Sequence, residues 1–394
     1  MTSSDPARDA LPPADATATI GATMARHSRP TPRGAARWIV VVALGLAALA
    51  CTPDPGGGGP TTTTTTLPPS DEPFTVIFVG DSEARMRGNT DAEVAGYVAD
   101  LASLTTTEVR TFDRDGGIHR VDPSLVILGG DISADRNTSI EADLPLWQPL
   151  YDAGIGFVAG FGNHDWDPAF FSDGPGYSVA GHLSNESTKA FTRETYRRTA
   201  QLDPTFTYQE VGPSSTHGPV TFAARFRGVG IVNFNTFLYQ PSYSYPEGWP
   251  LSCNLLQGGA GCQIFASAEP QIAAMESLLP TDPDTPMLFV QHYPLTTGSN
   301  WWSDEGASGT TVAQKQQRLL DLMARSRHRL LLAGHNHSPL TVDHAVAGGV
   351  AREVIAPYFG GNGGDDPTQG GGFVAVLVSP TEGILEVKTF PNGI

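Results

Sequence analysis

Basic side chains are scarce in this sequence. The chain of 394 residues holds 24 lysines and arginines against 41 aspartates and glutamates, which gives a formal net charge of -17 at pH 7. Such a chain repels a polyphosphate backbone, so no general nucleic-acid binding is expected. A substrate that carries phosphate would therefore need a local cation to bind it.

Charged residues of both signs are few as well, at 16% of the chain, whereas 40% of the chain is apolar. A chain of this length and composition can bury a sizeable core, which rules out wholesale disorder and a coiled coil. The length alone allows either two domains or one large one.

Cysteine is rare, and three cysteines are too few for a disulfide scaffold. Cys253 and Cys262 flank the flexible stretch 258–261. In an oxidising compartment these two cysteines are expected to close a small surface loop. The alternative is a pair of unbridged, small hydrophobic residues.

The apolar run near the N-terminus is too short to cross a membrane. It comprises the 13 residues 38–50, which as a helix would span about 20 Å of a bilayer core that is about 30 Å thick. Four arginines and no acidic residue stand between Met24 and Arg37, just before it. These features predict that residues 24–50 are a signal peptide and that the protein is exported. Residues 1–23 are either an overextended gene start or a long n-region.

The end of the signal peptide fits two cleavage sites. Ala48-Leu49-Ala50 is typical of an ordinary signal peptidase site. With Cys51 behind it, the same stretch resembles a bacterial lipobox, in which the cysteine is diacylated. A Gly, Thr and Pro-rich linker follows at residues 51–72, and this solvated tether favours a lipoprotein anchored on the extracytoplasmic face. The alternative is a freely secreted protein, so contact with a membrane is expected only through Cys51.

Residues 73–394 are predicted to form one domain in which short buried strands alternate with helices. Such a pattern is typical of an α/β fold. The predicted strands are 74–79, 125–128, 156–159, 287–290 and 330–333, with a hairpin at 221–226 and 229–234 and a closing pair at 372–378 and 384–387; the predicted helices are 92–104, 268–279 and 312–323.

Polar residues follow five of these strands at the point where each ends. Because loops at the carboxyl ends of buried strands converge on one crevice, these side chains are expected to meet. Asp, Asn and neutral His together offer oxygen and nitrogen ligands, which suit Mn, Fe, Co or Zn better than Ca or Mg. The five stretches are Asp81-Ser82-Glu83, Gly130-Asp131, Gly162-Asn163-His164-Asp165, Gln291-His292 and Gly334-His335-Asn336-His337.

In this order and at roughly this spacing, the five stretches resemble those of the calcineurin-like metallophosphoesterases. That superfamily includes purple acid phosphatases, phosphodiesterases and nucleotidases, and the resemblance covers about residues 73–390. It implies a four-layer sandwich of two mixed β-sheets flanked by helices. It also implies hydrolysis of a small phosphate ester by a hydroxide that two divalent or mixed-valence transition metal ions activate, with no covalent enzyme intermediate.

The resemblance also assigns a role to each matched residue. Asp131 would bridge the two ions, and Asp165 would orient His164, the proton donor to the leaving-group oxygen. One ion would be held by Asp81, Glu83 and His337, and the other by Asn163, His292 and His335.

Residue 83 departs from the family pattern, because the family has His where this chain has Glu83. Ligation by Glu83 would add a negative charge and favour harder ions such as Mn or Fe over Zn. If Glu83 turned to solvent, one ion would bind weakly. This departure keeps open a cell-surface binding module on a degenerate phosphoesterase scaffold. A third alternative, a structural lipoprotein associated with peptidoglycan, would not need these Asn-His-Asp and His-x-His loops.

Two further segments are expected to shape the mouth of the site, namely the insert at about residues 170–219 and the loop around Trp301 and Trp302. The histidines outside the five stretches, His344 among them, are expected to be surface or packing residues.

Overall fold

The computed structural model describes most of the predicted domain. The signal peptide, Cys51, the two remaining cysteines, Asn163, His164, Trp301 and Trp302 all lie outside the described residues. No helix in the described part is long and apolar enough to cross a membrane. The described residues are 71–84, 89–104, 110–114, 119–132, 143–160, 162, 165, 178–210, 222–234, 276, 279, 282–296, 312–360 and 370–391.

One sheet has five strands in the order β14-β13-β1-β4-β5. Its strands β1, β4 and β5 run parallel, and β13 and β14 pair antiparallel on the other side of β1. Every residue of β1, β5 and β13 is buried, because both faces of this sheet are covered. The strands are β1 (Phe74–Val79), β4 (Pro123–Leu128), β5 (Gly156–Ala159), β13 (Phe373–Ser379) and β14 (Gly383–Phe390).

The other large sheet has seven strands in the order β11-β12-β10-β9-β8-β7-β6. Its four central strands, β12, β10, β9 and β8, run parallel, and β6, β7 and β11 are antiparallel to their neighbours. The strands are β6 (Thr207–Glu210), β7 (Phe222–Phe226), β8 (Val229–Phe234), β9 (Met287–Gln291), β10 (Arg329–Ala333), β11 (Leu340–Val346) and β12 (Gly349–Ile355). A small separate ribbon pairs β2 (Thr111–Phe112) with β3 (His119–Arg120).

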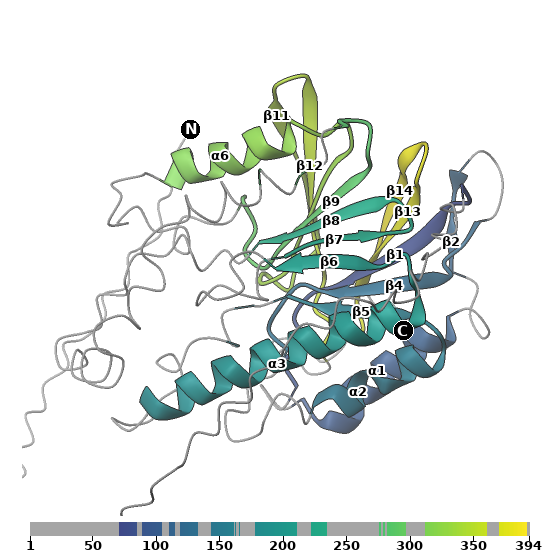
Figure 1. Cartoon of the computed structure of the whole chain (residues 1–394), viewed down its shortest axis with the longest axis vertical. Helices are drawn as coiled ribbons and strands as arrows, with labels where there is room; N and C mark the ends of the chain where they lie inside the picture. The colour runs from purple at the N-terminus through teal and green to yellow at the C-terminus, as the bar shows by residue number, and fades with distance from the viewer. Residues whose placement is uncertain are drawn as a thin grey trace, which may run out of the picture. The chain divides into compact units, whose positions relative to one another are not determined.

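The helices cover the outer faces of the two sheets (Figure 1). Helices α1 (Asp91–Ser103) and α2 (Leu144–Asp152) pack on the five-stranded sheet, and α6 (Val312–Met323) packs on the seven-stranded one. The Thr90 hydroxyl and the Glu93 carboxylate form a capping box that starts α1. A separate apolar core fills the space between the two sheets. The protein is therefore a four-layer sandwich of two mixed sheets flanked by helices, which confirms the predicted fold class.

Helix α3 (Ser178–Leu202) forms part of the segment 170–219, which the sequence predicts to shape the mouth of the site. The described side chains of α3, in its C-terminal half, pack along β5 instead. For residues 170–177 and 211–219, which lie outside the described residues, the expectation stays a prediction. Phe191 joins the core beneath α2, whereas Tyr196 joins the core between the sheets and donates a hydrogen bond to the Ala159 carbonyl. Buried aromatic rings at two faces of one helix make it part of the scaffold.

The predicted strand positions agree with the structure, and the predicted helices at 92–104 and 312–323 correspond to α1 and α6. The predicted hairpin is β7 and β8, which turn at Arg227 (φ +47°) and Gly228 (φ +87°). Two successive residues with positive φ are typical of the tight hairpin turn that matches strand twist. Most of the predicted helix at 268–279 lies outside the described residues.

Candidate metal centre

Four candidate ligands follow four parallel strands, two in each large sheet. Asp81 follows β1 and Asp131 follows β4, while His292 follows β9 and His335 follows β10. The two sheets approach each other closely here, because a Cβ added at Gly80 would lie 3.4 Å from Ala356 Cβ and 3.5 Å from Gly334 Cα. The carboxyl ends of the strands thus bring their loops together at one edge of the sandwich, as predicted for an α/β fold.

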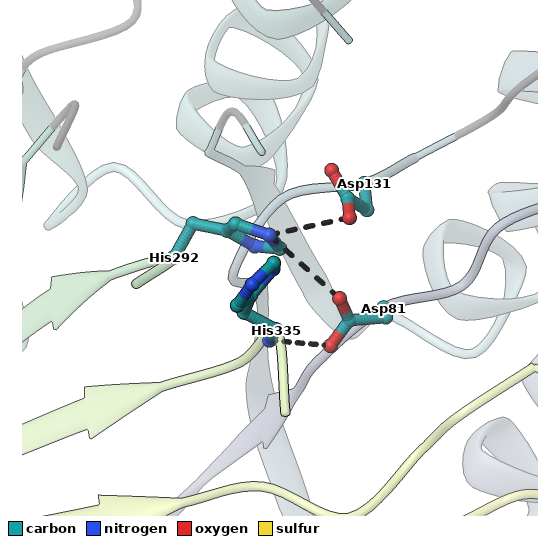
Figure 2. Close-up of side chains that lie close together, drawn as sticks. All are labelled: Asp81, Asp131, His292 and His335. Carbon is teal, nitrogen blue, oxygen red and sulfur yellow. Dashed lines mark hydrogen bonds and ion pairs between the residues drawn. The ribbon is translucent and has the colours of Figure 1, made fainter. Parts of the chain in front are cut away.

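The first group of candidate ligands comprises Asp81, Asp131, His292 and His335, each of which offers one atom within 4.8 Å of the others. Figure 2 shows the two imidazole rings directed toward the two carboxylates. His292 Nε2 lies 3.2 Å from Asp131 Oδ2 and 3.8 Å from Asp81 Oδ1. Asp81 Oδ2 accepts a hydrogen bond of 2.8 Å from the His335 backbone N–H, which fixes the orientation of this carboxylate.

The second group comprises Asp81, Glu83 and His337, again with one atom each within 4.8 Å. His337 Nε2 lies 3.4 Å from Asp81 Oδ1 and 3.7 Å from Glu83 Oε1. Glu83 is fully buried and faces this group, so it does not turn to solvent. The carboxylate common to both groups is Asp81, whereas the resemblance assigns the bridging position to Asp131.

The electrostatics of the first group favour a positive charge between the carboxylates. Burial raises the pKa of Asp81, but His337, His292 and His335 outweigh it and hold that pKa well below its usual range. Burial lowers the pKa of His292, yet Asp131 and Asp81 together raise it to about 9. Burial and the neighbouring His292 lower the pKa of His335 to about 3, so its ring is neutral and retains a lone pair.

The donor atoms of the two groups are of the kinds that bind a metal ion. Asp81 Oδ1 is buried and makes no hydrogen bond within the described part of the chain, although two imidazole nitrogens lie within 3.8 Å of it. A buried charged oxygen in this position is costly unless a cation compensates it. Carboxylate oxygens and imidazole nitrogens together suit Mn, Fe, Co or Zn.

Backbone strain is concentrated at the same residues. Glu83, Asp131, His335 and His337 have φ values of +39°, +52°, +69° and +57°, and the only other non-glycine residue with positive φ in the described ranges is Arg227 in its hairpin turn. Such conformations cost on the order of 1–3 kcal/mol each and persist where the surrounding structure enforces them. The fold therefore holds these four side chains in place at a cost in stability.

Asp165 fastens the Asp131 loop to the neighbouring loop. Its carboxylate accepts hydrogen bonds from the backbone N–H groups of Asp131, Ile132 and Gly162, at 2.8, 2.9 and 2.7 Å. Burial, together with the Asp131 carboxylate, raises the pKa of Asp165 to about 8 against the lowering effect of these amides. The prediction that Asp165 orients His164 stays a prediction, because Asn163 and His164 lie outside the described residues.

Sequence patterns did not indicate two residues beside Glu83. Tyr358, beyond β12, donates a hydrogen bond of 2.8 Å to Glu83 Oε2, and Asn89 donates one of 3.1 Å to the Glu83 carbonyl. Burial and the Glu83 carboxylate raise the pKa of Tyr358 well above its usual range, so the hydroxyl keeps its proton. The one available signal was the position of Tyr358 just past the carboxyl end of another buried strand.

A buried carboxylate that the sequence patterns also did not indicate holds the loop that follows His292. Glu353 on β12 accepts a hydrogen bond of 2.6 Å from the Leu295 N–H and another from the Thr296 hydroxyl. His344 on β11, expected to be a surface or packing residue, lies with Nε2 3.0 Å from the Glu353 carboxylate. This histidine therefore belongs to the support of the His292 loop.

Comparisons with known proteins give likenesses among solved structures only. A scan against protein-family models and a search of curated proteins give no match. TT1561 of Thermus thermophilus is 11% identical, with a TM-score of 0.36, over 82% of this chain and 100% of that one. GAP50, the anchor in the inner membrane complex of Plasmodium, is 12% identical, with a TM-score of 0.37, over 81% and 89%. The phosphopantetheinyl hydrolase PptH of Mycobacterium tuberculosis is 14% identical, with a TM-score of 0.32, over 73% and 91%.

Proposed function

We propose that this protein is a metal-dependent phosphoesterase that hydrolyses small phosphate esters outside the cytoplasm. The observation that carries the proposal is the buried Asp81 carboxylate, which two adjoining groups of Asp, Glu and His side chains share. One carboxylate shared between two ligand sets is suited to bridge a pair of metal ions, which lie about 3.5–4 Å apart in two-metal sites.

Two ions bound there would supply Lewis acidity, which acidifies a water molecule and neutralises phosphate oxygens. The acidic chain makes such a cation necessary for binding a phosphate ester. The protein's own part is to hold the ligand atoms: Asp81, Glu83 and His337 on one side, and Asp131, His292 and His335 on the other. Mn, Fe, Zn and Co are the ions that fit this set of oxygen and nitrogen donors.

Asn163 and His164 complete the proposed site. They stand between Gly162 and Asp165, whose backbone N–H and carboxylate are hydrogen-bonded to each other beside the Asp131 loop. From this loop, Asn163 would add a neutral oxygen ligand, and His164 would give a proton to the leaving-group oxygen. A proton donor of this kind contributes about 10²–10⁴-fold to a hydrolysis rate.

Chelation tests the proposal directly. We expect the purified mature domain to lose its turnover of chromogenic phosphate mono- and diesters after exhaustive removal of metal, because no ligand-held cation then remains to bind phosphate. Activity should return when Mn, Fe, Zn or Co is added, and elemental analysis before and after treatment measures the ions removed. Circular dichroism of the chelated protein controls for unfolding. Undiminished turnover would contradict the proposal, and tight phosphate-ester binding without turnover would favour the degenerate binding module.

Export is part of the proposal and rests on the sequence of residues 24–51. If Cys51 carries a lipid, Cys51→Ser is expected to move the protein from the membrane fraction of the producing cells to the soluble fraction, because the two acyl chains on this cysteine supply the anchor. Immunoblots of the separated fractions measure this shift, and Cys253→Ser is the matched control that should stay in the membrane. Unchanged partitioning of the Cys51 variant would favour simple secretion.

A further inference from the structure

Tyr358 contacts two of the three members of the second ligand group. Its hydroxyl donates to Glu83 Oε2, and its ring lies against the His337 imidazole with centroids 4.4 Å apart and an interplanar angle of 35°. Tyr358 and Glu83 are both buried, with exposed fractions of 1% and 0%. A hydrogen bond between buried groups holds the carboxylate more firmly than the same bond would in water.

Asn89 fixes the direction of that hydrogen bond. The Glu83 backbone carbonyl can only accept, so the Asn89 side-chain atom 3.1 Å from it must be the amide nitrogen. The same nitrogen lies 2.6 Å from the Tyr358 hydroxyl and donates to it as well. Because the hydroxyl oxygen accepts from Asn89, its own proton is directed to Glu83 Oε2. Asn89 thereby binds Glu83 at the backbone and, through Tyr358, at the side chain.

Asn89 and Tyr358 lie so close to Gly360 that no side chain fits at this position. A Cβ added at Gly360 would lie 2.5 Å from both Asn89 Nδ2 and the Tyr358 hydroxyl oxygen. The Gly360 N–H also donates a hydrogen bond of 3.0 Å to the Asp81 carbonyl. A side chain at position 360 would therefore push the two donors away from Glu83 without replacing any candidate ligand.

We propose that Tyr358 is the positioning residue of the second ligand group: by occupying Glu83 Oε2, it leaves Oε1 as the single oxygen that faces Asp81 and His337. This inference rests on the metal assignment made under the proposed function and concerns one of the two ligand groups. Partners that orient a ligating carboxylate typically account for 10–100-fold of metal affinity. Without the hydroxyl, the Glu83 carboxylate loses a hydrogen bond that orients it, so we expect the geometry at one ion to change while the Asp131, His292 and His335 side is kept.

The test is a titration of metal-free protein with Co²⁺, followed by calorimetry and by visible absorption. In Tyr358→Phe, which keeps the ring on His337, we expect one Co²⁺ site to weaken by about 10–100-fold and its absorption spectrum to change, while the other site keeps its affinity and spectrum. Tyr151→Phe is the matched control, because it removes another buried hydroxyl, one that donates to the Phe157 and Thr195 carbonyls.

Gly360→Ala provides a second variant that should weaken the same Co²⁺ site and alter the same spectrum. It keeps the inference testable if Tyr358→Phe fails to fold. Two Co²⁺ sites with wild-type affinities and spectra in either folded variant would overturn the inference, as would equal weakening of both sites in Tyr358→Phe. Wild-type protein that binds no Co²⁺ would instead overturn the proposed function, so the two failures are distinguishable.

Discussion

Asp81→Asn is expected to abolish tight metal binding in both ligand groups at once. Asp81 is the carboxylate that the two groups share, and it is fully buried with three histidines around it. Asparagine has nearly the same shape and keeps an oxygen to accept the His335 N–H, so the fold should persist. The negative charge that balances the cations is lost in this variant. We therefore expect the metal affinity to fall by well more than the 10–100-fold that follows removal of a residue hydrogen-bonded to a ligand.

Metal content by elemental analysis and phosphate-ester turnover measure this effect together, and both should fall to background in Asp81→Asn. Asp343→Asn is the matched control, because that exposed carboxylate on β11 forms an ion pair with Arg352 at the surface. Surface ion pairs contribute little to stability, so the control should retain metal and activity. One ion held at wild-type affinity in Asp81→Asn would show that Asp81 serves a single group.

Gly162→Ala is expected to abolish most of the activity of the metal centre, although Gly162 is not one of the candidate ligands. A Cβ at this position would lie 2.0 Å from Asp131 Oδ1 and 2.4 Å from the Asp131 backbone nitrogen. Contacts this short cannot persist, so the Gly162 and Asp131 loops must shift apart, and we expect the Asp131 carboxylate to be displaced from its position beside His292. A displacement of about 1 Å at a reacting centre can cost on the order of 10²-fold in rate, and we expect at least that loss of turnover.

Gly96→Ala is the control for this substitution. Gly96 lies in helix α1, and a Cβ there would meet nothing within 4 Å. Alanine at a compatible helical position stabilises a protein by about 0.4–1 kcal/mol, so this variant should melt slightly higher and remain active. Thermal unfolding and steady-state kinetics on both variants give the comparison. Wild-type turnover in Gly162→Ala would mean that the Asp131 loop is not held where the structure has it.

The apolar pattern of the sequence predicted the elements that carry the core. Strands β1, β4, β5, β9 and β10 are nearly continuous apolar runs because both faces of each sheet are covered. Such runs can be recognised as strands from the local sequence alone, without knowledge of the neighbouring strand. The edge strand β11 was missed because its residues are mostly exposed or half-buried, which leaves no apolar run. Helix α2 was missed because its sequence contains two prolines, although Trp147 and Leu150 bury fully against the sheet.

The candidate ligands could be predicted because each stands a fixed short distance beyond a strand. Asp81, Asp131, His292 and His335 lie where their strands end, so local sequence and one topological rule placed them together. Their support could not be predicted in this way. Tyr358 reaches Glu83 across 275 residues of sequence and Asn89 across 269, and neither residue belongs to a pattern. The membership of Asp81 in both groups likewise depends on side-chain directions that no spacing encodes.

The origin of the ligands in two different sheets gives the centre a mechanical role. Asp81 and Asp131 belong to the five-stranded sheet, whereas His292 and His335 belong to the seven-stranded one, and Asp81 and His335 are 254 residues apart in the chain. An ion bound among them would act as a reversible cross-link that closes most of the domain into one loop. Closing a loop costs entropy that grows only with the logarithm of its length, so a single tight ion can hold even so long a segment. The native state would then gain the free energy of metal binding, and the ion would join the two sheets at the edge where Glu83, Asp131, His335 and His337 have positive φ.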